Sequence, residues 1–279
     1  MTRAEPLART IEIRGVPVPK LGFGTFRLPG ADCREGVRDA LEIGYRHIDT
    51  ARGYENEREV GQGIAESGVA REEIWLTTKV PPEMAAADDV RTSAEDSLRL
   101  LGTDYVDLLL LHWPAASVPL EETMGALARL REEGKAREIG VSNFPPDHLR
   151  RALEHAPVFA DQVEYHPFLG QEPLLGVGRA NDVLITAYAP LAQGKVTRDP
   201  VIREIAEAHG RTPGQVALRW LLDQPGVAAI PKTATHARRI ENFDVFGFSL
   251  SDEDRARIDA LPKDQRDFDP EGIAPDWND

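Results

Sequence analysis

The sequence contains a single cysteine, Cys33, among its 279 residues. An intrachain disulfide is therefore excluded, and this cysteine usage is typical of a reducing compartment. No CxxC or CxxH motif surrounds Cys33, which falls in a charged, helix-like stretch. We interpret it as incidental to function.

Long hydrophobic runs and excess positive charge are also missing. Residues 1–15 lack the apolar core of a signal peptide, and no later run approaches the ~20 residues of a membrane span. Lys and Arg total 33 against 47 Asp and Glu, which gives a net charge of −14. Such a surface repels nucleic acid and anionic membranes. We therefore expect a cytoplasmic protein with neither partner.

The composition is that of a globular protein, with 41% hydrophobic and 29% charged residues. The length suits one large α/β barrel or two ordinary domains. No linker, repeat or low-complexity tract divides the chain, so we expect a single domain over residues 1–279.

Eight short apolar runs alternate with longer segments of helical periodicity. The runs are Leu21–Phe23, His47–Ile48, Ile74–Thr78, Val106–Leu111, Ile139–Val141, Val158–Val163, Val183–Ala187 and Val227–Ile230. The helical segments are Arg34–Ile43, Asn56–Ser67, Asp88–Leu101, Leu120–Glu133, Asp147–His155, Pro173–Ala180, a long one over Pro200–Leu222, and Thr235–Phe243. This alternation predicts an α/β fold, a (β/α)8 TIM barrel of parallel strands.

Two further segments frame the predicted barrel. TIEIRGVPVP alternates about Gly15 and predicts an N-terminal β-hairpin. Ser251 begins a last helix, which a short Pro- and Asp-rich C-terminal tail follows. The alternative fold is a doubly wound open sheet. It is disfavoured because LGFGTF at 21–26 matches GxGxxG poorly and no P-loop is present.

Polar residues follow the apolar runs at the point where each predicted strand ends. They are Asp49, Lys79, His112, Ser142 with Asn143, Gln162 with Glu164, Tyr188, and Lys232. Taken singly, each has an ordinary structural interpretation as a cap, a solvated strand end or a core side chain. Barrel active sites gather at the carboxyl ends of the strands. The recurrence along one rim therefore favours an active site.

The residue types on this rim suggest general acid chemistry. Asp49 and Lys79 on neighbouring strands can pair, and a lysine beside the Tyr54 hydroxyl would favour the phenolate and lower its pKa. His112 could donate a hydrogen bond to a carbonyl oxygen. This combination predicts a proton donor with an oxyanion-stabilising partner, and no nucleophile activated by a base. A hydride donor would have to be a cofactor.

Several motifs resemble those of the aldo-keto reductase family, in the family's order and over essentially the whole chain. They are GYRHIDTARGYENEREVG (44–61), LLLLHWP (108–114), GVSNF (140–144) and AIPKTATHARRIENF (229–243). The tail PEGIAPDW (270–277) is similar to that of short bacterial members, the 2,5-diketo-D-gluconate and methylglyoxal reductase type.

The resemblance implies a catalytic tetrad of Asp49, Tyr54, Lys79 and His112, with Tyr54 as proton donor and hydride transfer from NADPH to a small carbonyl substrate. The implied cofactor-binding residues are Thr25, Asp49, Ser142, Asn143, Gln162, Tyr188, Leu191, Gln193, Lys232, Thr233, Arg238, Glu241 and Asn242. Lys232 and Arg238 would hold the 2′-phosphate, which favours NADPH over NADH. The implied substrate pocket is Phe26, Tyr54, His112, Trp113 and Trp277. A monomer is the expectation from the family.

Three alternatives stay open from the sequence. A cofactor-sensing regulatory subunit would bind the nucleotide without turnover. An enone reductase of this fold would carry Glu at the position of His112. A metal-dependent hydrolase would use His47, His112, Asp49 and Glu164, but would leave Lys79 and Tyr54 without a role.

Overall fold

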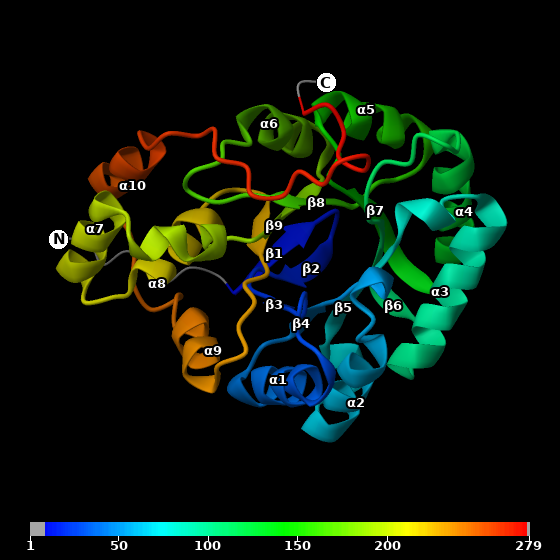
Figure 1. The fold of residues 1–279 in the computed structure, drawn as a ribbon, viewed down its shortest axis with the longest axis horizontal. Helices are drawn as coiled ribbons and strands as arrows, with labels where there is room; N and C mark the ends of the chain where they lie inside the picture. Colours follow the sequence, from blue (N-terminus) through cyan, green and yellow to red (C-terminus); the bar gives the residue numbers. More distant parts are fainter. Residues whose placement is uncertain (1–8, 278–279) are drawn as a thin grey trace.

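The computed structural model describes residues 9–277 and contains one curved sheet of eight parallel strands (Figure 1). The strands are β3 (Phe23–Gly24), β4 (His47–Asp49), β5 (Trp75–Val80), β6 (Val106–Leu111), β7 (Ala136–Ser142), β8 (Ala160–Glu164), β9 (Leu184–Tyr188) and β10 (Val227–Ala229). They pair in chain order from β3 to β10. The predicted strand order and direction are therefore confirmed.

Backbone contacts between the first and last strands close the sheet into a barrel. Leu21 forms a parallel bridge with Ala229, and the Gly22 N–H donates to the Ala229 carbonyl at 2.8 Å. The seam leaves no room for a side chain at residue 22, because a Cβ there would lie 2.8 Å from Cγ of His47. The predicted (β/α)8 barrel is confirmed.

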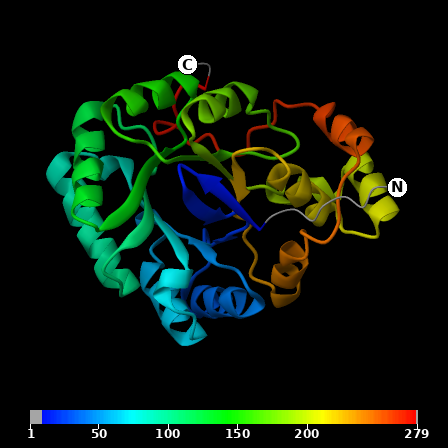
Figure 2. The ribbon, with the colours of Figure 1, turned by 180° about the vertical axis from the view of Figure 1, so that it is seen from behind.

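Helices surround the barrel in both views (Figures 1 and 2). They are α1 (Gly30–Ile43), α2 (Glu57–Ser67), α3 (Ala87–Leu101), α4 (Leu120–Glu132), α5 (Pro146–His155), α6 (Glu172–Asn181), α7 (Pro200–His209), α8 (Pro213–Leu222), α9 (His236–Phe243) and α10 (Asp252–Asp259). Each helix of residues 9–277 is too short or too polar to traverse a lipid bilayer.

The long helix predicted over Pro200–Leu222 is two helices, α7 and α8. Gly210 ends α7 with a φ of 60°, in the left-handed region that favours glycine. Thr212 then starts a new helix, because its hydroxyl accepts from the Gln215 N–H at 3.2 Å. Pro213 occupies the first turn of α8, where a missing N–H costs nothing.

The hairpin of β1 (Thr10–Ile13) and β2 (Val16–Pro19) covers the amino-terminal end of the barrel. Ile13 and Val18 are buried in one apolar cluster with barrel-interior residues such as Trp75 and Phe159. The blue arrows at the centre of Figure 2 show this placement. The predicted hairpin is confirmed, and its apolar face closes the end of the barrel opposite to the polar rim.

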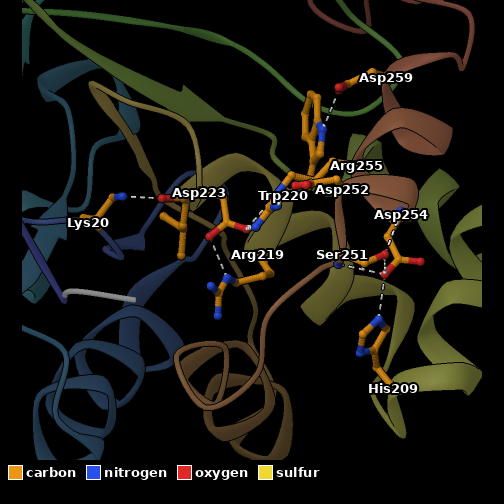
Figure 3. Close-up of polar contacts among 11 residues, drawn as sticks. Lys20, His209, Arg219, Trp220, Asp223, Ser251, Asp252, Asp254, Arg255 and Asp259 are labelled. Carbon is orange, nitrogen blue, oxygen red and sulfur yellow. Dashed lines mark hydrogen bonds and ion pairs between the residues drawn. The ribbon is translucent and has the colours of Figure 1, made fainter. Parts of the chain in front are cut away.

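Ionic contacts fix the last helices at this closed end (Figure 3). The buried Lys20 ammonium donates to the carbonyl of Leu222, the last residue of α8, where the helix dipole favours a cation. Asp223 accepts from Arg219 at 2.8 Å and from Arg255 of α10 at 3.0 Å. These contacts place α10, and hence the start of the tail, against α8.

The C-terminal tail returns from α10 to the opposite end of the barrel, where the strands terminate (Figure 1). Asp264 forms a β-bridge with Leu169, and the Gln265 N–H donates to the Phe168 carbonyl at 2.9 Å. The tail therefore crosses the loop that follows β8, beside the polar rim.

Candidate active site at the carboxyl ends of the strands

Asp49 and Lys79 form a buried ion pair at the rim of the barrel. Asp49 is the last residue of β4, and Lys79 lies near the end of the adjacent β5. Lys79 Nζ lies 2.6 Å from Asp49 Oδ1 and 2.7 Å from the Thr50 carbonyl oxygen. Burial lowers the pKa of Lys79, whereas the Asp49 charge raises it. The pairing predicted from the sequence is present.

The Tyr54 hydroxyl lies 3.4 Å from Lys79 Nζ. Tyr54 ends a short 3-10 helix (Arg52–Tyr54) directly after β4, which brings its half-buried ring over the pair. The expected lowering of its pKa is wrong. Burial raises the pKa of Tyr54 well above its usual value, and the Asp49 charge raises it further. Lys79 is drawn toward Asp49, so its charge does not outweigh these effects.

His112 follows β6 directly and faces Tyr54. The two rings meet edge-on with centroids 5.6 Å apart. Burial lowers the pKa of His112 to about 3, and the charge of Lys79 acts in the same direction. The imidazole is therefore neutral at physiological pH. The structure brings all four members of the predicted tetrad together.

The amide and hydroxyl groups expected to bind a cofactor lie beside this group. Gln162 Nε2 donates to Asp49 Oδ2 at 2.7 Å, and Ser142 Oγ donates to the Gln162 carbonyl at 2.7 Å. Asn143 has a φ of 63° and donates from Nδ2 to the His112 carbonyl at 3.0 Å. Its Oδ1 accepts from the Tyr188 hydroxyl at 2.7 Å. These residues form one continuous network around the rim.

Asn56 belongs to the site, although the sequence pattern indicated only a helix start there. Its Nδ2 donates to the carbonyls of Thr25 and Leu28 at 2.9 and 3.0 Å, and its Oδ1 accepts from Thr50 at 2.8 Å. Thr25 in turn donates from its hydroxyl to the Asp49 carbonyl at 3.0 Å. Asn56 thus fixes the loop that carries Phe26, whose ring lies 5.0 Å from that of Tyr54.

The residues expected to bind the distant part of a nucleotide lie beyond β9 and β10. Leu191 and Gln193 belong to the turn after β9, where Gln193 has a φ of 50°. Lys232 and Arg238 are exposed, and neither side chain forms an ion pair within residues 9–277. Two exposed cations without a carboxylate partner fit a phosphate.

Three other predicted residues line the same region. Thr233 is buried, and its hydroxyl accepts from the Thr235 N–H at 3.1 Å. Glu241 accepts from the Thr212 hydroxyl at 2.8 Å, and Asn242 is buried. Glu241 is therefore already bonded to the protein.

Arg239 was not singled out from the sequence. It is buried, forms an ion pair with Asp39 of α1, and donates to the Ala234 carbonyl at 3.1 Å. Through this hydrogen bond, Arg239 holds the loop that carries Lys232 and Thr233. The adjacent pair Arg238–Arg239 does not reveal which arginine is buried, because His236, Ala237 and Arg238 are consecutive residues of α9 and are all exposed.

Aromatic side chains from the tail and the strand ends surround the mouth of the site. The Trp113 and Trp277 rings meet edge-on with centroids 6.2 Å apart. Phe268, which the sequence did not indicate, lies 5.5 Å from the Tyr188 ring and 6.2 Å from Phe26. Phe268 therefore adds a further aromatic wall to the pocket predicted from Phe26, Trp113 and Trp277.

Glu164 anchors that tail. Its fully buried carboxylate accepts from the main-chain N–H of Asp267 at 2.7 Å and of Phe268 at 2.9 Å. His166 Nε2 contributes a third hydrogen bond at 2.9 Å. Three donors satisfy the charge, so Glu164 holds the main chain beside Phe268 in one position.

The residues of the alternative metal site do not converge. His47 lies at the start of β4, where its Nδ1 is 3.2 Å from the Pro19 carbonyl at the hairpin end of the barrel. Within residues 9–277, the ligand atoms that do approach one another belong to Glu164, His166 and Asp267. Protein donors already occupy this group, because Glu164 binds main-chain N–H groups and Asp267 pairs with Lys195.

Comparison with known proteins agrees with this arrangement. The glyoxal reductase of Bacillus subtilis (strain 168) is 44% identical over 255 residues, which cover 90% of this chain and 92% of that protein. The methylglyoxal reductase DkgB of Escherichia coli O157:H7 is 40% identical over 266 residues, with 94% and 99% coverage. The crystal structure of a putative 2,5-diketo-D-gluconic acid reductase B superposes with a TM-score of 0.94 at 44% identity, covering 96% of this chain and 97% of that one.

The family model for the aldo/keto reductase family matches residues 20–263, which include the whole barrel and every residue of the tetrad. This family generally uses nicotinamide cofactors and acts on small carbonyl compounds. The fold, the rim of polar residues and the similarity over nearly the full length lead to one conclusion: the chain belongs to the aldo/keto reductase family.

Proposed function

We propose that this protein is an NADPH-dependent reductase of small aldehydes and ketones, with Tyr54 as the general acid. The observation that carries the proposal is the position of Lys79 Nζ, 2.6 Å from the Asp49 carboxylate and 3.4 Å from the Tyr54 hydroxyl. This geometry serves proton donation to an oxygen atom, and no activated nucleophile lies beside it.

Tyr54 is the proton donor because its hydroxyl keeps its proton at neutral pH, as its raised pKa requires. The carbonyl oxygen of the substrate gains negative charge during reduction, and the Tyr54 O–H donates to it. Lys79 stabilises the tyrosinate that remains. Asp49 holds Lys79 in place while this happens.

His112 orients the carbonyl oxygen and does not supply the proton. Its pKa of about 3 leaves the ring neutral, so it has one N–H to donate as a hydrogen bond and no acidic proton to lose. The edge-on contact with Tyr54 places both donors on the same side of the pocket.

The proposed cofactor site follows the rim. When bound, the reduced nicotinamide supplies the hydride for the carbonyl carbon. Ser142, Asn143 and Gln162 would hold its carboxamide, and the half-buried Tyr188 ring would offer a flat apolar face. The turn carrying Leu191 and Gln193 would follow the pyrophosphate, and Thr25 would approach the ribose.

Discrimination between NADPH and NADH would depend on residues that follow β10. Lys232, Thr233 and Arg238 would hold the 2′-phosphate, and Glu241 and Asn242 would meet the adenine. A phosphate needs cations that a 2′-hydroxyl does not. Lys232 and Arg238 form no ion pair with the part of the chain that the structure describes, which supports NADPH as the cofactor.

The substrate class we propose is a small dicarbonyl or diketo-sugar acid. Relatives carry the names glyoxal reductase and methylglyoxal reductase, and a similar structure is titled as a 2,5-diketo-D-gluconic acid reductase. We propose further that residues 1–279 act as one domain, as a monomer in the cytoplasm.

A direct assay tests the proposal. Oxidation of NADPH and NADH is followed at 340 nm with methylglyoxal, 2,5-diketo-D-gluconate and an aromatic aldehyde. We expect NADPH-dependent turnover, lost in Tyr54→Phe while NADPH binding persists. Tight NADPH binding without turnover of any carbonyl would favour a regulatory subunit, and near-normal turnover in Tyr54→Phe would refute the tetrad.

A further inference from the structure

Arg266, in the C-terminal tail, carries a guanidinium group without a polar partner. Its Nη1 is buried, and the side chain forms no hydrogen bond or ion pair with any residue in 9–277. Arg34, Arg38 and Arg219 also bury a nitrogen without a hydrogen bond, but the guanidinium of each forms an ion pair with a carboxylate through Nε. Arg266 differs from them because its charge has no counterion within 4.0 Å among the described residues.

The guanidinium lies over an aromatic ring at the mouth of the site. Its Cζ is 3.5 Å from the Trp277 ring centroid, and Trp277 meets Trp113, the neighbour of His112 in the chain. A guanidinium that stacks on a ring engages through its flat face. Its N–H groups lie in the plane of the fork. Nη1 is buried, so the groups that stacking leaves free to donate to an incoming anion are those of Nε and Nη2.

The acidic groups around Arg266 are already bonded to other donors. Glu164 accepts from two main-chain N–H groups and from His166. Asp267 pairs with Lys195, and Asp269 accepts from Trp277 Nε1 at 2.8 Å. The charges of Glu164 and Asp269 act on Arg266, but only at a distance. The acidic groups of residues 9–277 therefore leave this cation without a direct partner, although the net charge of the chain is −14.

The position of Arg266 is fixed rather than loose. The next two residues, Asp267 and Phe268, are held through their main-chain N–H groups by Glu164. Phe268 packs beside Tyr188, with ring centroids 5.5 Å apart. Anchoring on one side and stacking on the other hold the cation at the edge of the pocket, where an anion would find it preorganised.

We propose that Arg266 binds the carboxylate of an oxo-acid substrate whose carbonyl group lies at Tyr54 and His112. A planar fork of N–H donors matches a carboxylate in two-point contact. A local cation would also offset the repulsion that the acidic surface exerts on an anionic substrate. The inference rests on the proposed reductase function and makes Arg266 the residue that selects acidic over neutral carbonyl compounds.

Matched substrate pairs test this role. The acids are 4-oxobutanoate and 4-formylbenzoate, and the neutral partner of each is its methyl ester. Each pair keeps the aldehyde and changes only the charge at the far end, at two different lengths. Wild type, Arg266→Gln, Arg266→Lys and the control Arg257→Gln are compared for kcat and KM with NADPH. Arg257 is a matched control because it lies on α10 and pairs with Glu204 at 2.8 Å.

In Arg266→Gln we expect kcat/KM for at least one acid to fall about tenfold or more, mainly through KM, as for the loss of one charge-assisted hydrogen bond. For the esters, kcat/KM should change less than about twofold, which corresponds to a small fraction of the free energy of such a hydrogen bond. Arg266→Lys should restore part of the selectivity, and Arg257→Gln should leave it unchanged.

Other outcomes would overturn the proposal. Equal losses for acid and ester would make Arg266 a structural part of the tail. A larger dissociation constant for NADPH in Arg266→Gln, with unchanged selectivity between acid and ester, would assign the guanidinium to the cofactor pyrophosphate. Wild-type turnover of the esters establishes the reductase independently of Arg266. No turnover of any of the four compounds would overturn this inference. The proposed function fails with it if methylglyoxal and 2,5-diketo-D-gluconate are not reduced either.

Discussion

Lys79 and Asp49 form a buried ion pair whose two members come from adjacent strands, with 2.6 Å between Nζ and Oδ1. Both side chains are almost completely shielded from water. The same ammonium reaches the Tyr54 hydroxyl at 3.4 Å. One contact therefore serves both the stability of the barrel rim and the proposed chemistry.

Asp49→Asn should lower both the stability of the protein and its turnover. Removing one partner leaves a buried charge uncompensated, which typically costs about 3 to 5 kcal/mol of unfolding free energy. Turnover should fall as well, because Lys79 loses the group that holds it. Urea unfolding and NADPH oxidation measure the two effects. Asp96→Asn is the control, since its pair with Arg52 is partly exposed and solvent screens it. Equal destabilisation by the two variants would contradict this account.

The His112 ring should stay neutral well below its usual titration range. Its pKa is lowered to about 3, against 6.5 for an unperturbed ring. Between these values the unfolded chain binds a proton that the folded protein does not, so the His112 contribution to stability falls as the pH is lowered through this window. Long-range ¹H–¹⁵N NMR of the imidazole follows the protonation directly. A midpoint near 6.5 would show that the ring is not desolvated.

Lys232→Ala combined with Arg238→Ala should change cofactor preference. The 2′-phosphate loses its proposed charge-assisted hydrogen bonds, so KM for NADPH should rise about tenfold or more. KM for NADH, which has no phosphate there, should change little. Steady-state kinetics with both cofactors provide the measurement. Arg151→Ala, an exposed arginine on α5, controls for the change in net charge. An equal rise in KM for NADPH and NADH would argue that Lys232 and Arg238 do not bind the 2′-phosphate.

Glu164→Gln should loosen the tail. The amide keeps one acceptor oxygen, so either Asp267 or Phe268 loses a main-chain hydrogen bond. We expect KM for the carbonyl substrate to rise by roughly tenfold, the cost of one charge-assisted bond, with a smaller change in kcat. Limited proteolysis should cut faster within residues 264–277. Glu172→Gln, exposed at the start of α6, is the control. An unaltered proteolysis rate would mean that Glu164 does not anchor this segment.

Asp161→Asn should stabilise the protein at neutral pH. Both Asp161 oxygens are buried without a hydrogen bond of standard geometry, and burial raises the pKa of this carboxyl well above its usual value, although the Phe144 main chain acts in the opposite direction. Above pH 3.8 the unfolded chain releases a proton that the folded protein retains, so stability falls as the pH rises. The nearly isosteric amide removes this effect, with a gain on the order of 1 kcal/mol at pH 7. Thermal unfolding from pH 5 to 8 should show a gain that grows with pH. A difference in stability between the two proteins that does not vary with pH would rule out titration of Asp161.

Local patterns carry enough information for the strands and the polar rim. Each strand of the barrel is an apolar run, and the residue that ends it faces the site because parallel strands share one rim. Asp49, Lys79 and His112 could therefore be placed from the sequence alone. The break between α7 and α8 also has a local signal, because Gly210 is typical of a helix end and Thr212–Pro213 of a helix start.

The tail residues could not be placed in this way. Phe268 and Arg266 have no periodic neighbours, and the hydrogen bond from Phe268 to Glu164 joins residues 104 apart in the chain. The pKa of Tyr54 is another such case. Its direction depends on how far burial outweighs a lysine at 3.4 Å, and no sequence pattern reports that balance.

The seam between Leu21 and Ala229 has a consequence for synthesis of the protein. The first strand of the barrel leaves the ribosome long before its partner exists. Until then, its main-chain groups and the apolar face of the hairpin stay uncovered, and exposed strand edges of this kind favour association between chains. Arg266 and Phe268 emerge later still, because they come about 100 residues after Glu164, which binds the main chain of Asp267 and Phe268. A nascent chain released early would therefore hold the tetrad residues without the wall that completes their pocket.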